Sequence, residues 1–201
     1  MNYLLIALAW TGYCSLHSYL ISIRFTELMK HILKGYYAFY RLFYVLISIV
    51  LLFPVFNYTG QLESEVIITY HPPWSIVRYA LIICSLLIFF KAFFFDHDSL
   101  SFLGIRQLLN FRKKLINQEE GIKKNGLLGV VRHPMYFAVI IYLWCQTFRL
   151  SDIVANAVLT AYVLIGTILE ERKLVLEFGD SYIQYQKEVP MLIPFTKFKS
   201  K

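Results

Sequence analysis

Apolar residues occur in long runs along this chain, and polar residues gather in the segments between them. A transmembrane helix needs about 20 apolar residues, and the first three runs are close to that length. The last two runs are shorter. We expect a tight turn at Ser151–Asp152 to join them into a helical hairpin packed within the bundle. The predicted spans are Tyr3–Ile23, Phe39–Phe56, Trp74–Phe95, Met135–Leu150 and Ile153–Leu169.

The composition indicates a bilayer rather than water as the solvent. Hydrophobic residues make up 58% of the 201 residues and charged residues 16%, whereas soluble domains average about 45–50% apolar and about 25% charged. The net charge of +7 comes from Lys and Arg residues between the apolar runs, which indicates membrane lipids rather than nucleic acid as partners. We predict an all-α fold, a polytopic membrane helix bundle with about five transmembrane helices, forming a single integral membrane domain over residues 1–201.

The charges between the predicted spans favour one orientation. The first connection carries Arg24, Lys30 and Lys34, and the third connection and the C-terminal tail are also basic. The second connection, Asn57–Pro73, contains two glutamates and no Lys or Arg. Because positive loops stay in the cytoplasm, we expect the N-terminus outside and the C-terminus inside. The protein should be a multi-pass protein of a bacterial cytoplasmic membrane.

Two cytoplasmic segments should be helical. The third connection should hold a helix around "LGIRQLLNFRKKLI". The fifth predicted helix should continue past Glu170–Glu171, because carboxylates at a helix C-terminus oppose the helix dipole. We expect it to run to Phe178, with Gly179 as the C-terminal stop, Asp180 capping a second short helix and Pro190 ending that helix.

The stretch "GVVRHPMY" places Arg132 and His133 at the start of an apolar run. One interpretation is structural: Pro134 suits a first helical turn, and Arg132 extends to lipid headgroups. The functional interpretation is that the Arg and His donors line a site for an anionic or polar ligand. Tyr136, one turn further in, could then stack on a flat heterocycle.

Other ionisable residues at membrane depth have two interpretations each. Glu170 and Glu171 are either a solvated helix end or carboxylates that hold the ammonium group of a ligand, because ionisable groups in membranes often mark a site. His17, within the first span, is either satisfied by a partner helix or takes part in chemistry. Asp96–His97–Asp98 predicts no metal site, because adjacent helical residues point different ways and no H-x-x-x-H pair occurs.

The order and spacing of these residues resemble a known superfamily. A Gly, then "VVRHPMY", then a hydrophobic hairpin, then "EER-L---FG--Y--Y---VP-LIP" resembles the isoprenylcysteine carboxyl methyltransferases and phospholipid N-methyltransferases over about residues 120–195. The earlier "LHS" and "FDHDSLSFLGIRQL" are most similar to the methanethiol S-methyltransferase and NnrU-like branch.

The resemblance implies S-adenosylmethionine as the methyl donor, bound by a core at residues 120–195. It implies that Glu170 or Glu171 holds the amino group of the cofactor and that Arg132 supports the pocket. The remaining residues that it implies as pocket lining are His133, Tyr136 and the backbone near Ile122 and Lys123.

Two departures from the family pattern affect the expected substrate. Leu128 stands where the family usually has a Tyr that stacks on the cofactor. The carboxyl methyltransferases carry an Arg about one turn before the glutamates, where this chain has Gly166 and Thr167. A carboxylate acceptor would lack its counter-charge there, so S-methyl transfer to a small thiol or lipid-soluble substrate is favoured over carboxyl-O or N transfer.

Two other functions remain open from the sequence. One is an NnrU-like membrane protein without enzymatic activity, and the other is a sterol-type membrane reductase that uses NADPH. Cofactor binding would separate the three functions. The sequence leaves the oligomeric state open.

Overall fold

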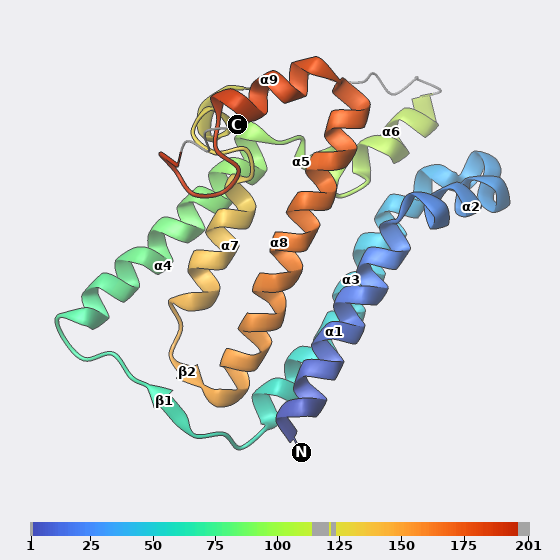
Figure 1. Cartoon of the computed structure of the whole chain (residues 1–201). Helices are drawn as coiled ribbons and strands as arrows, with labels where there is room; N and C mark the ends of the chain where they lie inside the picture. The colour runs from blue at the N-terminus through green and yellow to red at the C-terminus, as the bar shows by residue number, and fades with distance from the viewer. Residues whose placement is uncertain (1, 114–120, 122–123, 197–201) are drawn as a thin grey trace. The chain divides into compact units, whose positions relative to one another are not determined.

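The computed structural model describes residues 2–113, 121 and 124–196 and is almost entirely helical (Figure 1). In chain order the elements are α1 (Asn2–Ile21), α2 (Ile23–Leu33), η1 (Lys34–Phe39), α3 (Tyr40–Gln61), β1 (Val66–Ile68), α4 (Trp74–Lys91), η2 (Ala92–Asp96), α5 (Ser99–Phe102), α6 (Ile105–Lys113), η3 (Gly126–Gly129), α7 (Pro134–Trp144), β2 (Phe148–Arg149), α8 (Leu150–Phe178) and α9 (Asp180–Glu188). The prediction of an all-α fold is confirmed.

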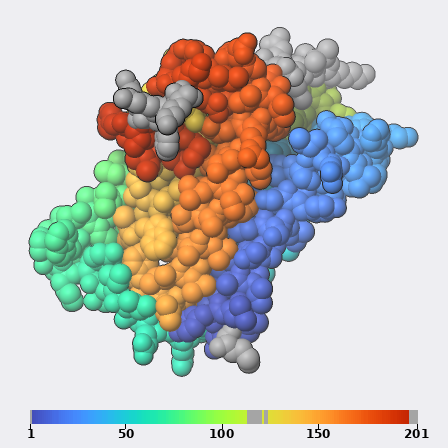
Figure 2. Space-filling view, viewed as in Figure 1, coloured from blue at the N-terminus to red at the C-terminus, as the bar shows by residue number. Residues whose placement is uncertain are grey.

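Four helical stretches of the described chain are long and apolar enough to cross a membrane. They are Asn2–Ile21, Ile23–Gln61, Trp74–Asp96 and Leu150–Phe178, and α7 is a shorter apolar helix. Large apolar side chains lie on their surfaces, among them Ile165 and Leu169 of α8, which is seen in orange on the face shown in Figure 2. This pattern confirms a polytopic membrane protein. The inside–outside orientation stays a prediction.

The chain divides into two compact units that alternate along the sequence. Unit 1 comprises Met1–Ile67, Ser99–Glu119 and Arg149–Leu159, and unit 2 comprises Ile68–Asp98, Glu120–Phe148 and Thr160–Lys201. The predicted single domain and the predicted core at 120–195 stay predictions.

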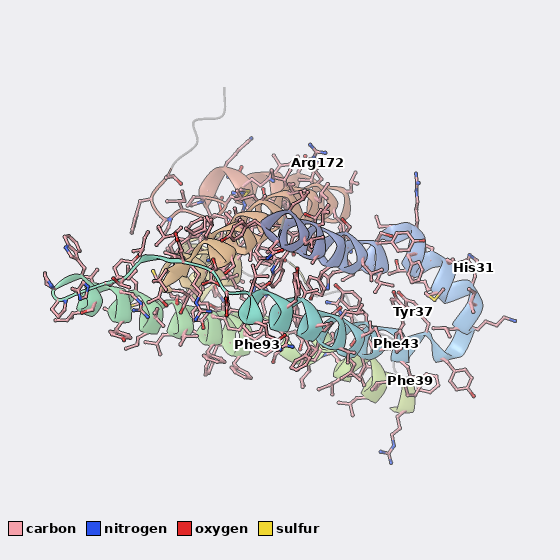
Figure 3. All side chains as sticks on the ribbon, turned by 90° about the horizontal axis from the view of Figure 1, so that it is seen from below. His31, Tyr37, Phe39, Phe43, Phe93 and Arg172 are labelled. Atoms are coloured by element: carbon pink, nitrogen blue, oxygen red, sulfur yellow. The ribbon has the colours of Figure 1, made fainter. Side chains whose placement is uncertain are left out.

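In unit 1, α1 packs against α3. Ile6, Trp10 and Ala155 form its buried apolar cluster. The indole Nε1 of Trp10 donates to Thr59 Oγ1 at 3.0 Å, so the polar edge of this buried ring is satisfied. At the start of α3, Phe39 and Phe43 are exposed (Figure 3), as expected for side chains that face lipid.

The side chain of His17 on α1 forms hydrogen bonds with residues of α3. Its Nδ1 lies 3.0 Å from Ser48 Oγ, and its Nε2 lies 2.7 Å from the hydroxyl of Tyr44. Because the Ser48 hydroxyl donates to the Tyr44 carbonyl at 2.7 Å, its oxygen accepts from His17 Nδ1. Both ring nitrogens of His17 therefore lie within hydrogen-bond distance of groups on α3. The interpretation that a partner helix satisfies it is confirmed.

In unit 2, α4 packs against α7, and η2 packs against η3. Asp96 Oδ2 accepts from the backbone N–H of Leu127 at 3.1 Å. Gly126 has a φ of +64°, and a Cβ there would collide with the Asp96 carboxylate. Asp96 thus fixes the turn that leads into "VVRHP".

The predicted turn at Ser151–Asp152 is wrong. Helix α7 ends at Trp144, β2 pairs with β1 in a two-stranded sheet, and α8 begins at Leu150. Asp152 Oδ2 accepts from the backbone N–H of Arg149 at 3.1 Å. An acidic residue in a first turn stabilises a helix start, so these two polar residues open α8 and the connection lies before them.

The predicted cytoplasmic helices are present. Helix α8 continues through the glutamates to Phe178, and Gly179 follows with a φ of +57°. Asp180 is the first residue of α9 and its side chain makes no capping hydrogen bond, so the predicted Asp180 cap is wrong. Helix α9 ends at Glu188, two residues before Pro190, which cannot donate a helical hydrogen bond. Helix α6 lies within "LGIRQLLNFRKKLI" as predicted.

Candidate functional site

Backbone hydrogen bonds tie "RHP" to the segment after α9. The N–H of Arg132 donates to the Pro190 carbonyl at 2.9 Å, and the N–H of His133 donates to the Met191 carbonyl at 3.1 Å. Pro134 then begins α7, where its missing N–H costs nothing. The tripeptide and the chain after α9 therefore form one connected piece of unit 2.

Arg132 and Glu171 form a buried ion pair at the centre of this piece. Their side chains are only 7% and 10% exposed. Arg132 Nε donates to Oε1 at 2.5 Å and Nη2 donates to Oε2 at 2.7 Å, which is the paired geometry that a guanidinium and a carboxylate favour. Arg132 Nη1 also donates to the carbonyls of Gln186 and Val189. All three nitrogens of the guanidinium are thus bonded.

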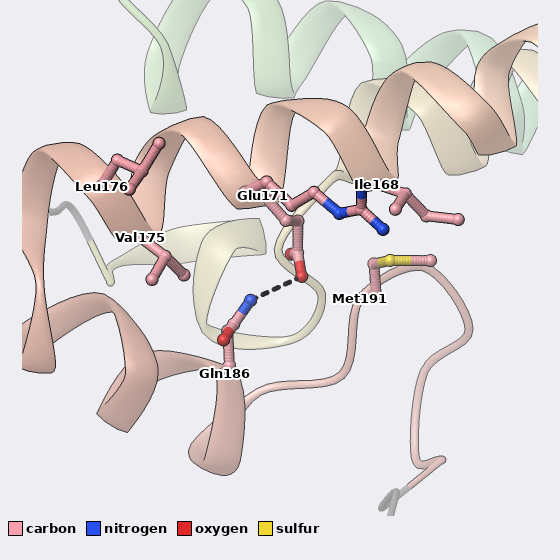
Figure 4. Close-up of a pocket in the computed structure, with 7 residues that line it drawn as sticks. Ile168, Glu171, Val175, Leu176, Gln186 and Met191 are labelled. Carbon is pink, nitrogen blue, oxygen red and sulfur yellow. Dashed lines mark hydrogen bonds between the residues drawn. The ribbon is translucent and has the colours of Figure 1, made fainter.

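Glu171 accepts from three more side chains. His133 Nε2 lies 3.1 Å from Oε1, the Tyr182 hydroxyl donates to Oε1 at 3.3 Å, and Gln186 Nε2 donates to Oε2 at 2.8 Å (Figure 4). Burial raises the pKa of the Tyr182 hydroxyl, which keeps it protonated as a donor. Both oxygens of Glu171 are therefore occupied by groups of the chain.

Glu170 has a different environment from its neighbour. Its side chain is 43% exposed, and Oε2 lies 3.8 Å from His133 Nδ1. The Tyr136 hydroxyl donates to the same oxygen at 2.9 Å. The rings of His133 and Tyr136 stack with centroids 5.5 Å apart and planes 11° apart. The arrangement presents a carboxylate with open coordination beside two parallel rings.

Helix α9 is fixed to η3 by a second tyrosine. The Tyr185 hydroxyl donates to the Leu128 carbonyl at 2.6 Å, and burial raises the pKa of Tyr185 to about 12, so the group is a neutral donor at physiological pH. Lys124, which lies just before η3, adds an exposed ion pair with Glu188 of α9 at 2.9 Å. Leu128, the departure from the family pattern, is itself buried.

The structure brings together five of the seven predicted cofactor residues: Arg132, His133, Tyr136, Glu170 and Glu171. Ile122 and Lys123 lie outside the described residues. The sequence interpretation assigned no role to Tyr182, Tyr185 or Gln186. Their spacing of three and four residues places them on one face of a helix, and this spacing was the available signal.

Among the described residues no three His, Cys, Asp or Glu side chains are grouped as metal ligands. Asp96, from the acidic triplet considered above, bonds the backbone of Leu127 instead.

A pocket of about 440 Å³ lies beside the ion pair (Figure 4). Its volume falls within the usual range for ligand sites. It lies on the α8 strip that contains Ile168, Arg172 and Leu176, spaced four residues apart. Glu170 is about 160–200° around the helix from Ile168 and Arg172. The lining residues are Ile168, Glu171, Arg172, Val175, Leu176, Gln186 and Met191.

Comparison with protein families gives one match over most of the chain. Residues 22–188 match the family model described as "Protein of unknown function (DUF1295)". No solved structure matches the chain.

Curated relatives match a shorter part. A methanethiol S-methyltransferase from Pseudomonas sp. (strain GM41(2012)) is 35% identical over 109 residues, which is 54% of this chain and 41% of the relative. A methanethiol S-methyltransferase from Crocosphaera subtropica is 30% identical over 128 residues, 63% of this chain and 49% of the relative. The protein-S-isoprenylcysteine O-methyltransferase of Schizosaccharomyces pombe is 34% identical over 82 residues, 39% and 35% of the two chains. The matched part thus spans less than half the length of these relatives.

Proposed function

The chain belongs to the DUF1295 family, and from this premise we propose that it is a membrane-embedded, S-adenosylmethionine-dependent methyltransferase. We propose a small thiol or a lipid-soluble molecule as the acceptor. The names of the similar proteins support S-methyl transfer. The observation that carries the proposal is the half-exposed Glu170 carboxylate beside the stacked rings of His133 and Tyr136.

The residues present fit S-adenosylmethionine. The cofactor has a cationic amino group and a flat purine, and it supplies an electrophilic methyl group carried on a sulfonium. Glu170 offers a carboxylate that the chain leaves 43% exposed, and a carboxylate is the natural partner of an ammonium group. The His133 ring is only 7% exposed and stacks on Tyr136, so the partly exposed ring of Tyr136 is the one that can offer a face to a heterocycle.

Glu171 is proposed as a positioning residue. Its oxygens accept from Arg132, His133 and two residues of α9, so binding a ligand directly would break bonds that the fold already makes. Its part is to hold the His133 ring in orientation while Glu170 binds the amino group. Of the two glutamates that the family resemblance implied, we therefore favour Glu170 as the ligand carboxylate.

The acceptor proposal depends on charge. Between Ile153 and Leu169 the chain has no basic residue, so a buried acceptor carboxylate would lack a counter-charge there. A thiol needs no such partner. A thiol as acidic as cysteine has a pKa of about 8.5, so a few per cent of it is already ionised near neutral pH. Alignment of donor and acceptor then provides most of the catalysis.

The test is methyl transfer from labelled S-adenosylmethionine to methanethiol by protein purified in neutral detergent. The wild type and Lys173→Gln should form labelled dimethyl sulfide, and Glu170→Gln should lower the rate at least about tenfold, because a hydrogen bond to a charged group contributes about 1.5–3 kcal/mol. Equal rates in wild type and Glu170→Gln would contradict the site. If the folded wild-type protein bound NADPH instead of S-adenosylmethionine, or bound neither of these cofactors, that result would contradict the proposed methyltransferase function.

A further inference from the structure

Arg172 is a cation without a partner beside the apolar pocket. In the part of the chain that the structure describes, its guanidinium makes no hydrogen bond and no ion pair. The neighbouring Glu171 does not neutralise it, because both Glu171 oxygens are bonded to Arg132 and the groups around it. In Figure 3 the Arg172 side chain extends away from the helix ribbon. The exposed guanidinium can therefore pair with an anion from outside the described chain.

The pocket beside Arg172 is apolar and open. Ile168 and Leu176 are 46% and 86% exposed, and Met191 of the segment after α9 lies opposite Ile168 (Figure 4). Ile193 and Phe195, further along the same segment, are 61% and 95% exposed. Exposed apolar surface next to a charge marks a contact with a protein or a membrane.

The spacing of three side chains along α8 fits contact with a lipid molecule. Ile168, Arg172 and Leu176 follow one another at four-residue spacing, and eight residues of helix are about 12 Å long. This strip lies near the end of a stretch apolar enough to span a membrane. There an Arg stem lies along acyl chains while its head reaches phosphate.

This strip is separate from the proposed methyl-transfer site. Glu170 lies on the opposite side of α8, and Tyr136 and His133 contact that side. The pocket lining also includes Glu171 and Gln186 of the ion-pair network, whose side chains are bonded to each other. An occupant of the pocket would contact this network on the side of α8 opposite Glu170.

We propose that the pocket binds an anionic phospholipid. One acyl chain lies against Ile168, Val175, Leu176 and Met191, and the phosphate pairs with Arg172. The charge of Arg172 selects an anionic headgroup, and the apolar lining excludes a free inorganic anion. The proposal goes beyond methyl transfer and does not depend on it.

The test compares phosphatidylglycerol with phosphatidylcholine of identical acyl chains, added to protein in neutral detergent and counted as bound lipid by native mass spectrometry. The wild type should retain phosphatidylglycerol more tightly. Arg172→Gln should weaken phosphatidylglycerol about fivefold, because one basic residue at an anionic lipid surface contributes about 1 kcal/mol. It should weaken phosphatidylcholine less, because the choline cation of that lipid offsets the charge of the same phosphate.

Lys173→Gln is the matched control, because it removes the same charge about 100° around the helix and outside the pocket lining. Leu176→Gln tests the apolar part. It should weaken both lipids without unfolding the protein, since Leu176 is 86% exposed. Equal losses in Arg172→Gln and Lys173→Gln would overturn the proposal, as would equal retention of the two lipids by the wild type or an unchanged Leu176→Gln.

Discussion

Two buried polar clusters of the described residues differ in composition and in what they leave open. The His17 cluster of unit 1 joins an imidazole ring to two hydroxyl groups, and both ring nitrogens lie within hydrogen-bond distance of α3. The Glu171 cluster of unit 2 is charged, and beside it Glu170 remains half exposed. Helix–helix hydrogen bonds explain the first cluster fully. Only the second cluster combines a satisfied charged centre with an available carboxylate, which is why we place the chemistry there.

Removing Arg132 should have the largest effect on the charged cluster. Arg132→Ala leaves the buried Glu171 carboxylate without its counter-charge, and such losses cost about 3–5 kcal/mol. The free energy of unfolding in detergent measures the effect, with Lys173→Ala as the exposed control. A loss no larger than that of Lys173→Ala would mean that the ion pair is not structural.

Removing His17 should have a smaller effect. His17→Ala breaks the bonds to Ser48 and Tyr44, and hydrogen bonds between membrane helices contribute about 0.6–1.7 kcal/mol each. The free energy of unfolding should fall by about 1–2 kcal/mol, whereas cofactor affinity should be unchanged because His17 is a structural residue in this account. If the folded His17→Ala variant no longer bound the cofactor, the His17 cluster would not be purely structural.

The hydrogen bond from the Tyr185 hydroxyl of α9 to the Leu128 carbonyl of η3 should be lost at alkaline pH. Because the pKa of Tyr185 is raised to about 12 in the fold from about 10, the folded state binds more protons between these values and stability falls as pH rises through them. Tyr185→Phe should cost about 1 kcal/mol at neutral pH and flatten the alkaline slope. Unfolding midpoints from pH 8 to pH 11 check this. A slope identical to that of the wild type would contradict the Tyr185 assignment.

The smallest effect should come from Tyr136. Tyr136→Phe keeps the stacked ring and removes the hydroxyl that donates to Glu170. The free energy of unfolding should change by less than about 0.5 kcal/mol, and cofactor affinity should fall only a few-fold, about 0.5–1.5 kcal/mol for one hydrogen bond. Tyr136→Ala, which also removes the ring, should lower affinity further. Equal affinities in the two variants would show that the ring has no part in binding.

Much of the fold followed from local patterns. The extension of α8 to Phe178 was predictable because Glu170–Glu171 suit a helix interior better than its end, and Gly179 is a strong stop signal. The turn at Ser151–Asp152 was wrong because polar residues at a helix start resemble a loop. Only tertiary structure shows whether such polar residues form a loop or begin a helix.

The residues of the site could be predicted from the sequence, but the role of each residue could not. The motif put Glu170 and Glu171 together, but adjacent residues face different directions, and their environments depend on Arg132 and α9, which are distant in sequence. Tyr182 is a position of the family motif, which indicated no role for it, and Gln186 had only helical spacing as a signal, because a donor to a buried carboxylate has no signature of its own.

The most direct test of the account is S-adenosylmethionine binding to detergent-purified protein, measured by calorimetry for wild type, Glu170→Gln and His17→Ala. The account predicts saturable binding in the wild type and in His17→Ala, and an affinity lower by at least about tenfold in Glu170→Gln. Glu170→Gln should unfold at the same temperature as the wild type. Wild-type affinity in folded Glu170→Gln, or no binding by folded wild type, would contradict it.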